Sequence, residues 1–325
     1  MRAGKTTSSL LTIVNAAVLI FSAISIFSAR PPEKDLEGSL TISGAWALYP
    51  MVLRWAEEFK KLYPGVRIDV QAGGAGKGIA DVLAGVVDVG MVSRDIHPAE
   101  VKRGALAIAV CKDAVVPTIS EKNPLRDHIL QKGVTRQMCI QVWITEEATT
   151  WGHFLGKDEK VPLHVYTRSD ACGAAETWAA FLGRSQEDLK GVGVYGDPGL
   201  AEAVRRDRLG IGFNNINYAY DAKTKKPVLG IAILALDLNG NGQVDEEENF
   251  YEDRDAITQA IARGAYPSPP ARDLYLVTKG KPANALIVEF LAWTLREGQR
   301  YVPDTGYIVL SPEKLAEGLR KIGLR

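Results

Sequence analysis

The order of apolar and polar positions along the chain predicts strands that alternate with helices. A short alternating strand is expected at 40–43, and a helix begins near Pro50, where apolar residues recur every three or four positions. Further strands are predicted at 66–70, 86–91, 163–166 and 274–277, and further helices around 79–83, 175–182, 200–204, 286–293 and 315–322. Other apolar elements lie at 105–110, 115–119, 140–144, 211–213 and 228–234, and the proline-rich segment 266–270 is expected to cross between elements. This pattern predicts an α/β fold.

Three of the predicted strands end in turns of small residues. The turns are Gly44–Ala47, Gly73–Gly78 and Ser93-Arg94, and the first two open helices. In an open α/β sheet the carboxyl ends of the strands share one edge, and ligands bind along it. We therefore expect these turns to lie together at a binding site.

A fourth turn, between the strand at 163–166 and the helix at 175–182, has the clearest anion-binding chemistry. The free N–H groups and the dipole at a helix N-terminus favour an anion. Arg168 adds a planar fork of donors that matches a carboxylate, phosphate or sulfate, and Asp170 can hold that fork in place. The alternative is a surface ion pair at an ordinary helix start. The recurrence of similar turns along the chain favours the anion site.

Two glycine-rich stretches do not predict a nucleotide site. The segment Gly73–Gly78 is not a Walker A loop, because Gln71 stands where the first glycine belongs and Gly78 replaces the hydroxyl residue that would hold magnesium. The segment Gly191–Gly196 matches the dinucleotide motif in letters, but polar residues 186–190 precede it instead of a buried strand. We interpret the second match as a coincidence.

Composition narrows the class of protein. The 39 basic and 39 acidic residues balance, so the chain has no basic surface for nucleic acid, and any anion must be held by a local site. Arg2 and Lys5 precede an apolar run at 10–27, which predicts export. Residues 1–30 are either a cleaved signal peptide or a retained signal anchor. No cysteine stands directly after the run, which excludes a lipoprotein anchor.

Neither the cysteines nor the histidines suggest a metal site or redox chemistry. With three cysteines, Cys111, Cys139 and Cys172, an exported chain has at most one disulfide and at least one free thiol. The spacing CxxC is absent, and the four histidines are scattered without forming a ligand pair.

The segment 237–248 fits the twelve-residue calcium loop of EF-hands. Gly242 occupies the turn position and Val244 the apolar eighth position. The predicted oxygen ligands are Asp237, Asn239, Asn241, Gln243, Asp245 and Glu248. Because no second loop pairs with it, a structural Ca²⁺ is expected and not a calcium sensor. The alternative is a polar acidic loop.

Taken in order, the motifs resemble one family, the substrate-binding proteins of phosphate ABC transporters. The resemblance runs from about Ser39 to Leu319. It rests on Ser43-Gly44-Ala45 with Tyr49-Pro50, Gly74-Ala75-Gly76-Lys77-Gly78, Val87-Asp88-Val89-Gly90, Arg168-Ser169-Asp170, Gly196-Asp197-Pro198-Gly199 with Ile211-Gly212-Phe213, and Gly298-Gln299 with Gly306-Tyr307. It implies a type II periplasmic-binding-protein-like fold, in which two α/β lobes joined by two crossovers close on an anion in a central cleft. Lobe I is expected at 36–113 plus 267–325 and lobe II at 114–266.

The resemblance also implies a set of ligand-binding residues. These are Leu48, Tyr49, Ala75, Gly76, Ser93, Arg94, Arg168, Asp170, Cys172, Gly173 and Ala174, with backbone N–H donors at 48, 49, 76, 173 and 174. Several side chains depart from the family pattern. Leu48 and Ala174 stand where the family usually has threonine, Ala75 and Cys172 where it has serine, and Ser93 where an aspartate accepts the proton of hydrogen phosphate. Each lost hydrogen bond costs about 0.5–1.5 kcal/mol, so fixed charge and backbone N–H groups must hold the anion.

The function that the resemblance implies is delivery of phosphate or a related oxyanion to an ABC permease. The protein is expected to be a monomer outside the cytoplasmic membrane, to need no cofactor, and not to be an enzyme. One alternative is a hydrolase of phosphate esters, in which Cys172 is the only candidate nucleophile. Another is a calcium-stabilised anion sensor or adhesion protein on the same fold.

Overall fold

The computed structural model describes residues 36–324, and their buried side chains form two separate hydrophobic cores. One core includes Trp55, Phe59 and Phe290, and the other includes Trp143, Trp178 and Phe213. Each core lies between helices and a group of strands, so the two-lobed α/β fold predicted from the sequence is confirmed. The predicted leader at 1–30 lies outside the described residues.

The first lobe is built on a parallel arrangement of β1, β2 and β3. β1 pairs with both of the others in parallel, and β3 pairs with β9 in the antiparallel sense. Pro50 lies in the first turn of α1, where its missing N–H costs nothing. The elements are β1 (Gly38–Gly44), α1 (Tyr49–Leu62), β2 (Val66–Ala72), α2 (Ala75–Ala84), β3 (Val89–Val92), α3 (Pro98–Lys102), the first part of β4 (Ala105–Ser120), β9 (Ala271–Lys279), α11 (Ala285–Leu295), η3 (Glu297–Tyr301) and α12 (Pro312–Lys321).

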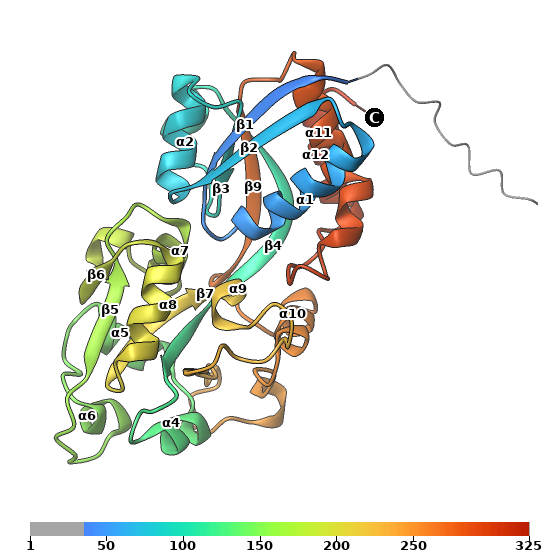
Figure 1. The fold of residues 1–325 in the computed structure, drawn as a ribbon. Helices are drawn as coiled ribbons and strands as arrows, with labels where there is room; N and C mark the ends of the chain where they lie inside the picture. Colours follow the sequence, from blue (N-terminus) through green and yellow to red (C-terminus); the bar gives the residue numbers. More distant parts are fainter. Residues whose placement is uncertain (1–35, 325) are drawn as a thin grey trace, which may run out of the picture. The chain divides into compact units, whose positions relative to one another are not determined.

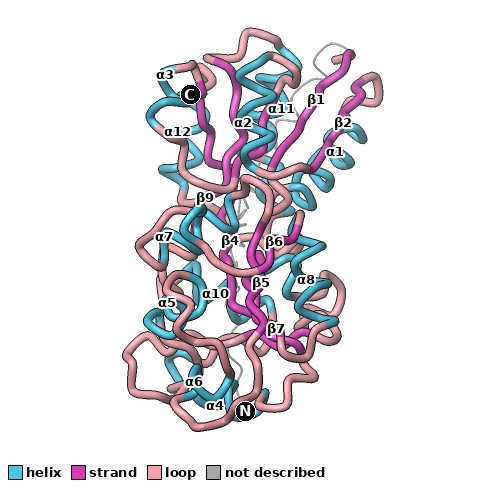
Figure 2. The backbone as a smooth tube through the Cα atoms, turned by 90° about the vertical axis from the view of Figure 1, so that its left-hand side faces the viewer, coloured by secondary structure: helices cyan, strands magenta, loops and turns pink. Residues whose placement is uncertain are grey.

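The second lobe repeats this plan with β5, β6 and β7, which are parallel to one another. Figure 2 shows these strands beside β4, with α8 on one side and α5 and α7 on the other. The elements are α4 (Arg126–Lys132), α5 (Arg136–Trp143), α6 (Trp151–Leu155), β5 (His164–Arg168), α7 (Gly173–Phe181), η1 (Gln186–Asp188), β6 (Val192–Val194), α8 (Gly196–Arg206), β7 (Gly210–Asn215), α9 (Ile216–Ala219), β8 (Ile231–Ile233), η2 (Glu246–Glu248) and α10 (Arg254–Ala262).

Two antiparallel strands, β4 and β9, connect the lobes. Figure 1 shows β4 running from the blue and red elements of the first lobe into the green and yellow elements of the second. Its first part pairs with β9, and its second part, from Val115, pairs with β7. The sequence suggested two elements at 105–110 and 115–119, but they form one continuous strand. The predicted boundaries at 113/114 and 266/267 stay predictions.

Some sequence expectations were wrong in detail. The strand predicted at 86–91 begins only at Val89, because Gly85 ends α2 in the left-handed conformation and Val86 is exposed. Leu62, the last residue of α1, is also exposed. A short strand, β6, forms inside the segment Gly191–Gly196. Within residues 36–324, no helix is long and apolar enough to cross a membrane.

Candidate functional site

The three turns of the first lobe lie together, as the strand order predicts. The carbonyl of Gly44, at the end of β1, accepts the N–H groups of Gly73 at 2.8 Å and Gly74 at 3.0 Å. The N–H of Ala45 donates to the carbonyl of Met91 in β3 at 2.9 Å. The carboxyl edge of this half of the sheet is therefore a continuous set of hydrogen-bonded turns.

The carboxyl edge of the second lobe carries most of the charged groups of the site. β5 ends at Arg168, β7 ends at Asn215, and the turn after β6 leads into Asp197 in the first turn of α8. All three side chains are buried. Parallel strands bring these ends together although they are far apart in the sequence.

The two carboxyl edges touch each other. The N–H of Gly76, in the first turn of α2, donates to the carbonyl of Ala171 at 3.0 Å. Gly74 has φ +93°, and a Cβ there would lie 2.9 Å from the Ala171 oxygen. A Cβ on Gly173, at the start of α7, would overlap the backbone and the Oγ of Ser93. Glycines at these positions therefore permit the helix N-termini of both lobes to approach closely.

Arg168 lies at this junction with its guanidinium fully buried. Its Nε and Nη2 donate to the two carboxylate oxygens of Asp170 at 2.8 and 2.7 Å, the bidentate geometry that the sequence suggested. Its Nη1 lies 3.0 Å from Oδ1 of Asp197 but makes no well-aligned hydrogen bond within the described residues. Burial opposes the charged form, but the carboxylates of Asp197 and Asp170 outweigh it and raise the pKa of Arg168. The guanidinium therefore stays charged and retains donor capacity on Nη1.

Asp197 has a role in this site that the sequence analysis did not assign. Its Oδ1 accepts the Nδ2 of Asn215 at 2.7 Å as well as facing Arg168. Burial raises the pKa of Asp197, against the nearby arginines, which lower it. The motif Gly196-Asp197-Pro198-Gly199 was recognised as part of the resemblance, but nothing local in the sequence places it against Arg168.

A second buried arginine, Arg272 of β9, was also missed. Its Nε donates to Asp113 of β4 at 2.9 Å, and its Nη1 donates to Oγ1 of Thr177 at 2.9 Å. It also donates to the carbonyl of Gly173 and to Oδ1 of Asn215. An arginine near the start of an apolar strand gives no sequence signal of such contacts. Only the pairing of β4 with β9 reveals them.

The predicted backbone donors divide into two groups. The N–H groups of Leu48 and Tyr49 donate to carbonyls within their own turn, at 3.2 Å each, and that of Gly76 donates to Ala171. Gly173 and Ala174 open α7, so their N–H groups have no carbonyl partner within the helix and point beyond its N-terminus. In this structure these two N–H groups are the best placed of the five for an anion.

Ser93 and Arg94 follow β3 but differ in their surroundings. Ser93 is buried against Gly173, at the contact between the lobes. Arg94 turns away: Nη1 and Nη2 donate to Glu100 at 2.9 and 2.6 Å, and Nε lies 3.0 Å from Glu176 of α7. Arg94 is thus an ion-pair partner in this structure, and its predicted role as an anion ligand stays a prediction.

Cys172 caps α7, and its environment disfavours nucleophilic chemistry. Its Sγ accepts the N–H of Ala175 at 3.4 Å. Burial raises the pKa of the Cys172 thiol to about 12, so the thiolate is scarce at neutral pH. Ala75 and Ala174 are buried at the first turns of α2 and α7 and offer no hydroxyl. All three cysteines are free and buried.

The predicted calcium loop is held by hydrogen bonds within itself. Asp237 and Glu248 are buried and accept backbone N–H groups, at 2.7 Å each from Gly240 and Leu238. Side-chain amides of the other predicted ligands donate to Asp245: Asn239, Asn241 and Gln243. Among residues 36–324, no group of three or more His, Cys, Asp or Glu side chains is placed to hold a metal ion. The structure therefore does not support the predicted metal site.

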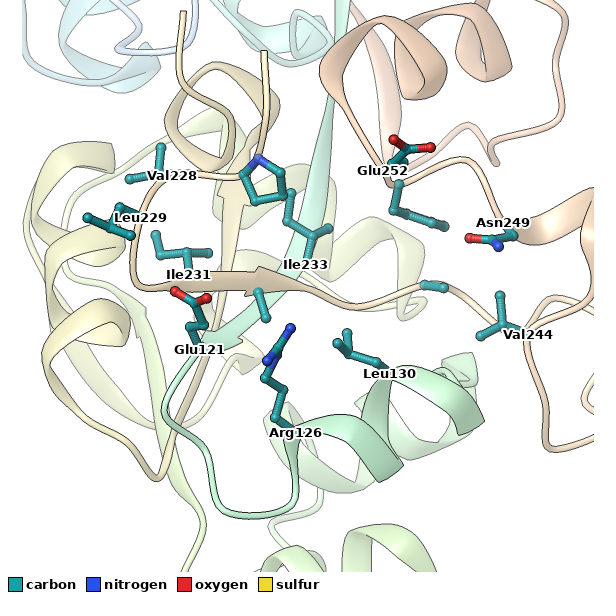
Figure 3. Close-up of a pocket in the computed structure, with 14 residues that line it drawn as sticks. Glu121, Arg126, Leu130, Val228, Leu229, Ile231, Ile233, Val244, Asn249 and Glu252 are labelled. Atoms are coloured by element: carbon teal, nitrogen blue, oxygen red, sulfur yellow. The ribbon is translucent and has the colours of Figure 1, made fainter. Parts of the chain in front are cut away.

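Among the pockets of the described residues, two differ in their relation to the buried arginines Arg168 and Arg272. Figure 3 shows one of about 410 Å³, where β8 supplies Ile231 and Ile233 as an apolar wall. Its Glu121 accepts the N–H of Gly230 at 3.1 Å. The other, of about 340 Å³, lies beside α7 and is lined by Arg94, Glu176, Thr177 and Arg272 among others. Neither pocket is lined by Arg168.

Comparisons with known proteins agree on one family. The model of the PBP superfamily domain matches residues 29–297. The phosphate-binding protein PstS of Pseudomonas aeruginosa PAO1 is 29% identical, over 97% of this chain and 97% of the relative. The PstS of Bacillus subtilis 168 is 30% identical, over 89% of this chain and 86% of the relative.

Solved structures show the same fold. A putative phosphate ABC transporter substrate-binding protein from Clostridium perfringens, solved with bound phosphate, has a TM-score of 0.69 and 22% identity. The match covers 84% of this chain and 100% of the other. An ABC-type phosphate transport receptor from Vibrio cholerae has a TM-score of 0.60 and 18% identity, over 83% of this chain and all of the other.

Proposed function

Since this chain belongs to the PBP superfamily and, within it, to the substrate-binding proteins of phosphate ABC transporters, we propose that it binds phosphate or a related oxyanion between its lobes. The observation that carries the proposal is the meeting of two helix N-termini, those of α2 and α7, beside the buried guanidinium of Arg168. Helix N-termini and a charged fork of donors are the groups that bind oxyanions. The proposed ligand contacts are Nη1 of Arg168 and the N–H groups of Gly173 and Ala174.

We propose that the protein lies outside the cytoplasmic membrane and delivers the anion to an ABC permease in that membrane. The relatives named phosphate-binding protein align over nearly the whole chain, which supports this role. The apolar run at 10–27, predicted from the sequence to direct export, supports the location. Recovery of the full-length protein in the cytosol would contradict it.

Calorimetric titration against a panel of oxyanions tests the ligand. Phosphate is expected to bind with a stoichiometry of one, and sulfate is included because Ser93 replaces the proton-accepting aspartate of the family pattern. Absence of binding to every oxyanion in the panel would overturn the proposal.

The hydrolase alternative has less support. It requires Cys172 as nucleophile, and the raised pKa of that thiol keeps it neutral. Turnover of phosphate esters, measured with and without divalent metals, would favour the hydrolase. Calcium binding at 237–248 is retained as a proposal that rests on the loop pattern in the sequence alone.

A further inference from the structure

An ion pair buried between the two connecting strands has contacts that reach the proposed anion site. Asp113 of β4 and Arg272 of β9 are directly opposite each other in the antiparallel pair. Their side chains are 1% and 7% exposed, and Nε of Arg272 donates to Oδ1 of Asp113 at 2.9 Å. A buried ion pair is weak support for the stability of a fold. The other contacts of Arg272 therefore indicate a role besides stabilising the fold.

The remaining donors of Arg272 hold the first turn of α7. Nη1 donates to Oγ1 of Thr177 at 2.9 Å and to the carbonyl of Gly173. Gly173 and the next residue supply the two N–H groups that are best placed for an anion. The guanidinium thus fixes the position of these donors relative to β4 and β9.

Arg272 also reaches Arg168 through two intermediate side chains. Its Nη2 donates to Oδ1 of Asn215, and Nδ2 of Asn215 donates to Oδ1 of Asp197 at 2.7 Å. The same carboxylate oxygen lies 3.0 Å from Nη1 of Arg168. A change at Arg272 is therefore transmitted to the two kinds of proposed anion donor, the α7 N-terminus and the guanidinium.

The charges of the cluster do not balance. Among the described residues, Asp113, Asp170 and Asp197 are paired with the two guanidiniums of Arg168 and Arg272, which leaves one excess negative charge when all five are ionised. Burial raises the pKa of Asp113 to about 6, although Arg272 opposes the shift. The other titratable groups near Asp113 are Asp197, whose pKa is also raised, and Cys111 and Tyr307, whose burial keeps them neutral.

We propose that Arg272 is a positioning residue for the bound oxyanion. We also propose that the ionisation of Asp113 sets the net charge of the buried groups next to the anion site. The inference rests on the proposed function, because it concerns the same site. In this proposal Arg272 acts through other groups and does not itself contact the anion. It holds the α7 donors and Arg168 in one arrangement, and protonation of Asp113 removes a negative charge from the surroundings of the anion.

The first test is calorimetry of the full chain with inorganic phosphate. Arg272→Lys keeps the charge but cannot reach all four partners, so affinity is expected to fall about tenfold, comparable to the loss when a residue that orients a metal ligand is changed. The matched control is Arg205→Lys on the exposed face of α8, where, among residues 36–324, the ion-pair partner of Arg205 is Glu202. The control is expected to bind as the wild type does.

A milder variant covers the case in which Arg272→Lys does not fold. Thr177→Val removes one acceptor of Nη1 and keeps the shape of the side chain. It is expected to weaken phosphate binding by about threefold or more, with the melting temperature little changed. Wild-type affinity in both variants, or in Thr177→Val alone if Arg272→Lys is unfolded, overturns the inference. Absence of phosphate binding by the wild type would instead refute the proposed function, and the inference with it.

The pH profile tests the part played by Asp113. Asp113→Asn keeps an oxygen for Nε of Arg272 and permanently removes the charge. The ratio of wild-type to variant dissociation constants is used because the ionisation of phosphate cancels in it. This ratio is expected to be near one at about pH 5 and to rise several-fold by about pH 8, since only the wild type gains a negative charge. A ratio that does not vary with pH overturns the role of Asp113.

Discussion

At the scale of single residues, Arg168 is both a proposed anion-binding residue and part of a buried network of ion pairs. Its Nε and Nη2 donate to Asp170, and its Nη1 lies 3.0 Å from Oδ1 of Asp197 without a well-aligned hydrogen bond. Removing one partner of a buried ion pair costs about 3–5 kcal/mol, because the remaining charge is left uncompensated. Loss of Arg168 therefore affects both the fold and the ligand.

We expect Arg168→Ala to weaken oxyanion binding by about ten- to a hundredfold or more, since a charge-assisted hydrogen bond contributes about 1.5–3 kcal/mol. Arg168→Lys should recover little of this, because lysine cannot satisfy two carboxylates and an anion at once. Calorimetry measures the affinity, and circular dichroism establishes that the variants are folded. Arg184→Lys, at an exposed position in the same lobe, is the control. Undiminished binding by Arg168→Ala would mean that the site lies elsewhere.

Cys172→Ser is expected to strengthen oxyanion binding by about two- to tenfold. A hydroxyl can cap α7 as the thiol does and can also donate to the anion, for about 0.5–1.5 kcal/mol. The resemblance to the family suggests serine at this position. Cys139→Ser is the matched control, because that thiol is buried in the second core. It should lower the melting temperature without changing the affinity, and equal affinities for Cys172→Ser and the wild type would contradict the prediction.

At the scale of elements, the N-termini of α2 and α7 and the loop 237–248 share one structural feature. In each, backbone N–H groups converge on a point that suits negatively charged oxygen. In the loop, these groups donate to Asp237 and Glu248 of the chain itself. In α7, the N–H groups at the helix start point beyond the helix. The N–H groups of the loop therefore have acceptors within the loop, whereas α7 offers donors to a ligand.

The calcium proposal predicts a higher melting temperature in calcium. Binding to the native state alone adds about 2.7 kcal/mol of stability at a hundredfold excess over Kd. Glu248→Gln should abolish the rise, and Glu252→Gln, just outside the loop, should not. A melting curve unchanged at millimolar calcium would favour the self-contained loop, in agreement with the hydrogen bonds in the structure.

At the scale of the whole molecule, contacts between the lobes extend beyond the proposed site. Tyr218 of the second lobe donates to the carbonyl of Trp46 in the first at 3.1 Å. Glu176 of α7 lies 3.0 Å from Nε of Arg94 and 3.2 Å from Nε2 of His97. Burial raises the pKa of Glu176, while Arg94 lowers it. Glu176 therefore links an element of the second lobe to two residues that follow β3.

Glu176→Gln is expected to loosen this contact and to accelerate release of the anion by about two- to fivefold. The expected effect is small because Glu176 is partly exposed and such pairs contribute only about 0–1 kcal/mol. Stopped-flow dissociation measures the rate, and small-angle scattering measures the separation of the lobes without ligand. Glu202→Gln removes an ion pair within α8 and should change neither. An unchanged rate in Glu176→Gln would show that the contact of Glu176 with Arg94 and His97 does not slow release of the anion.

The sequence alone determined the elements and the fold class. Period-two alternation and helical spacing are local properties, so they placed β1, α1, β2 and α2 within a few residues of their observed bounds. The same local signals identified the turns at the strand ends and the pair of Arg168 with Asp170, whose members are two residues apart. These features depend on neighbours along the chain.

Only the tertiary structure decided which distant groups share the site. Asp197, Asn215, Arg272 and Asp113 meet because parallel strands align their carboxyl ends and because β4 pairs with β9 in one register. It also decided that Arg94 pairs with Glu176 and that the carboxylates of the loop 237–248 accept backbone N–H groups of the loop. Burial and hydrogen-bond partners depend on strand register and on the approach of the two lobes. No local pattern in a single sequence encodes them.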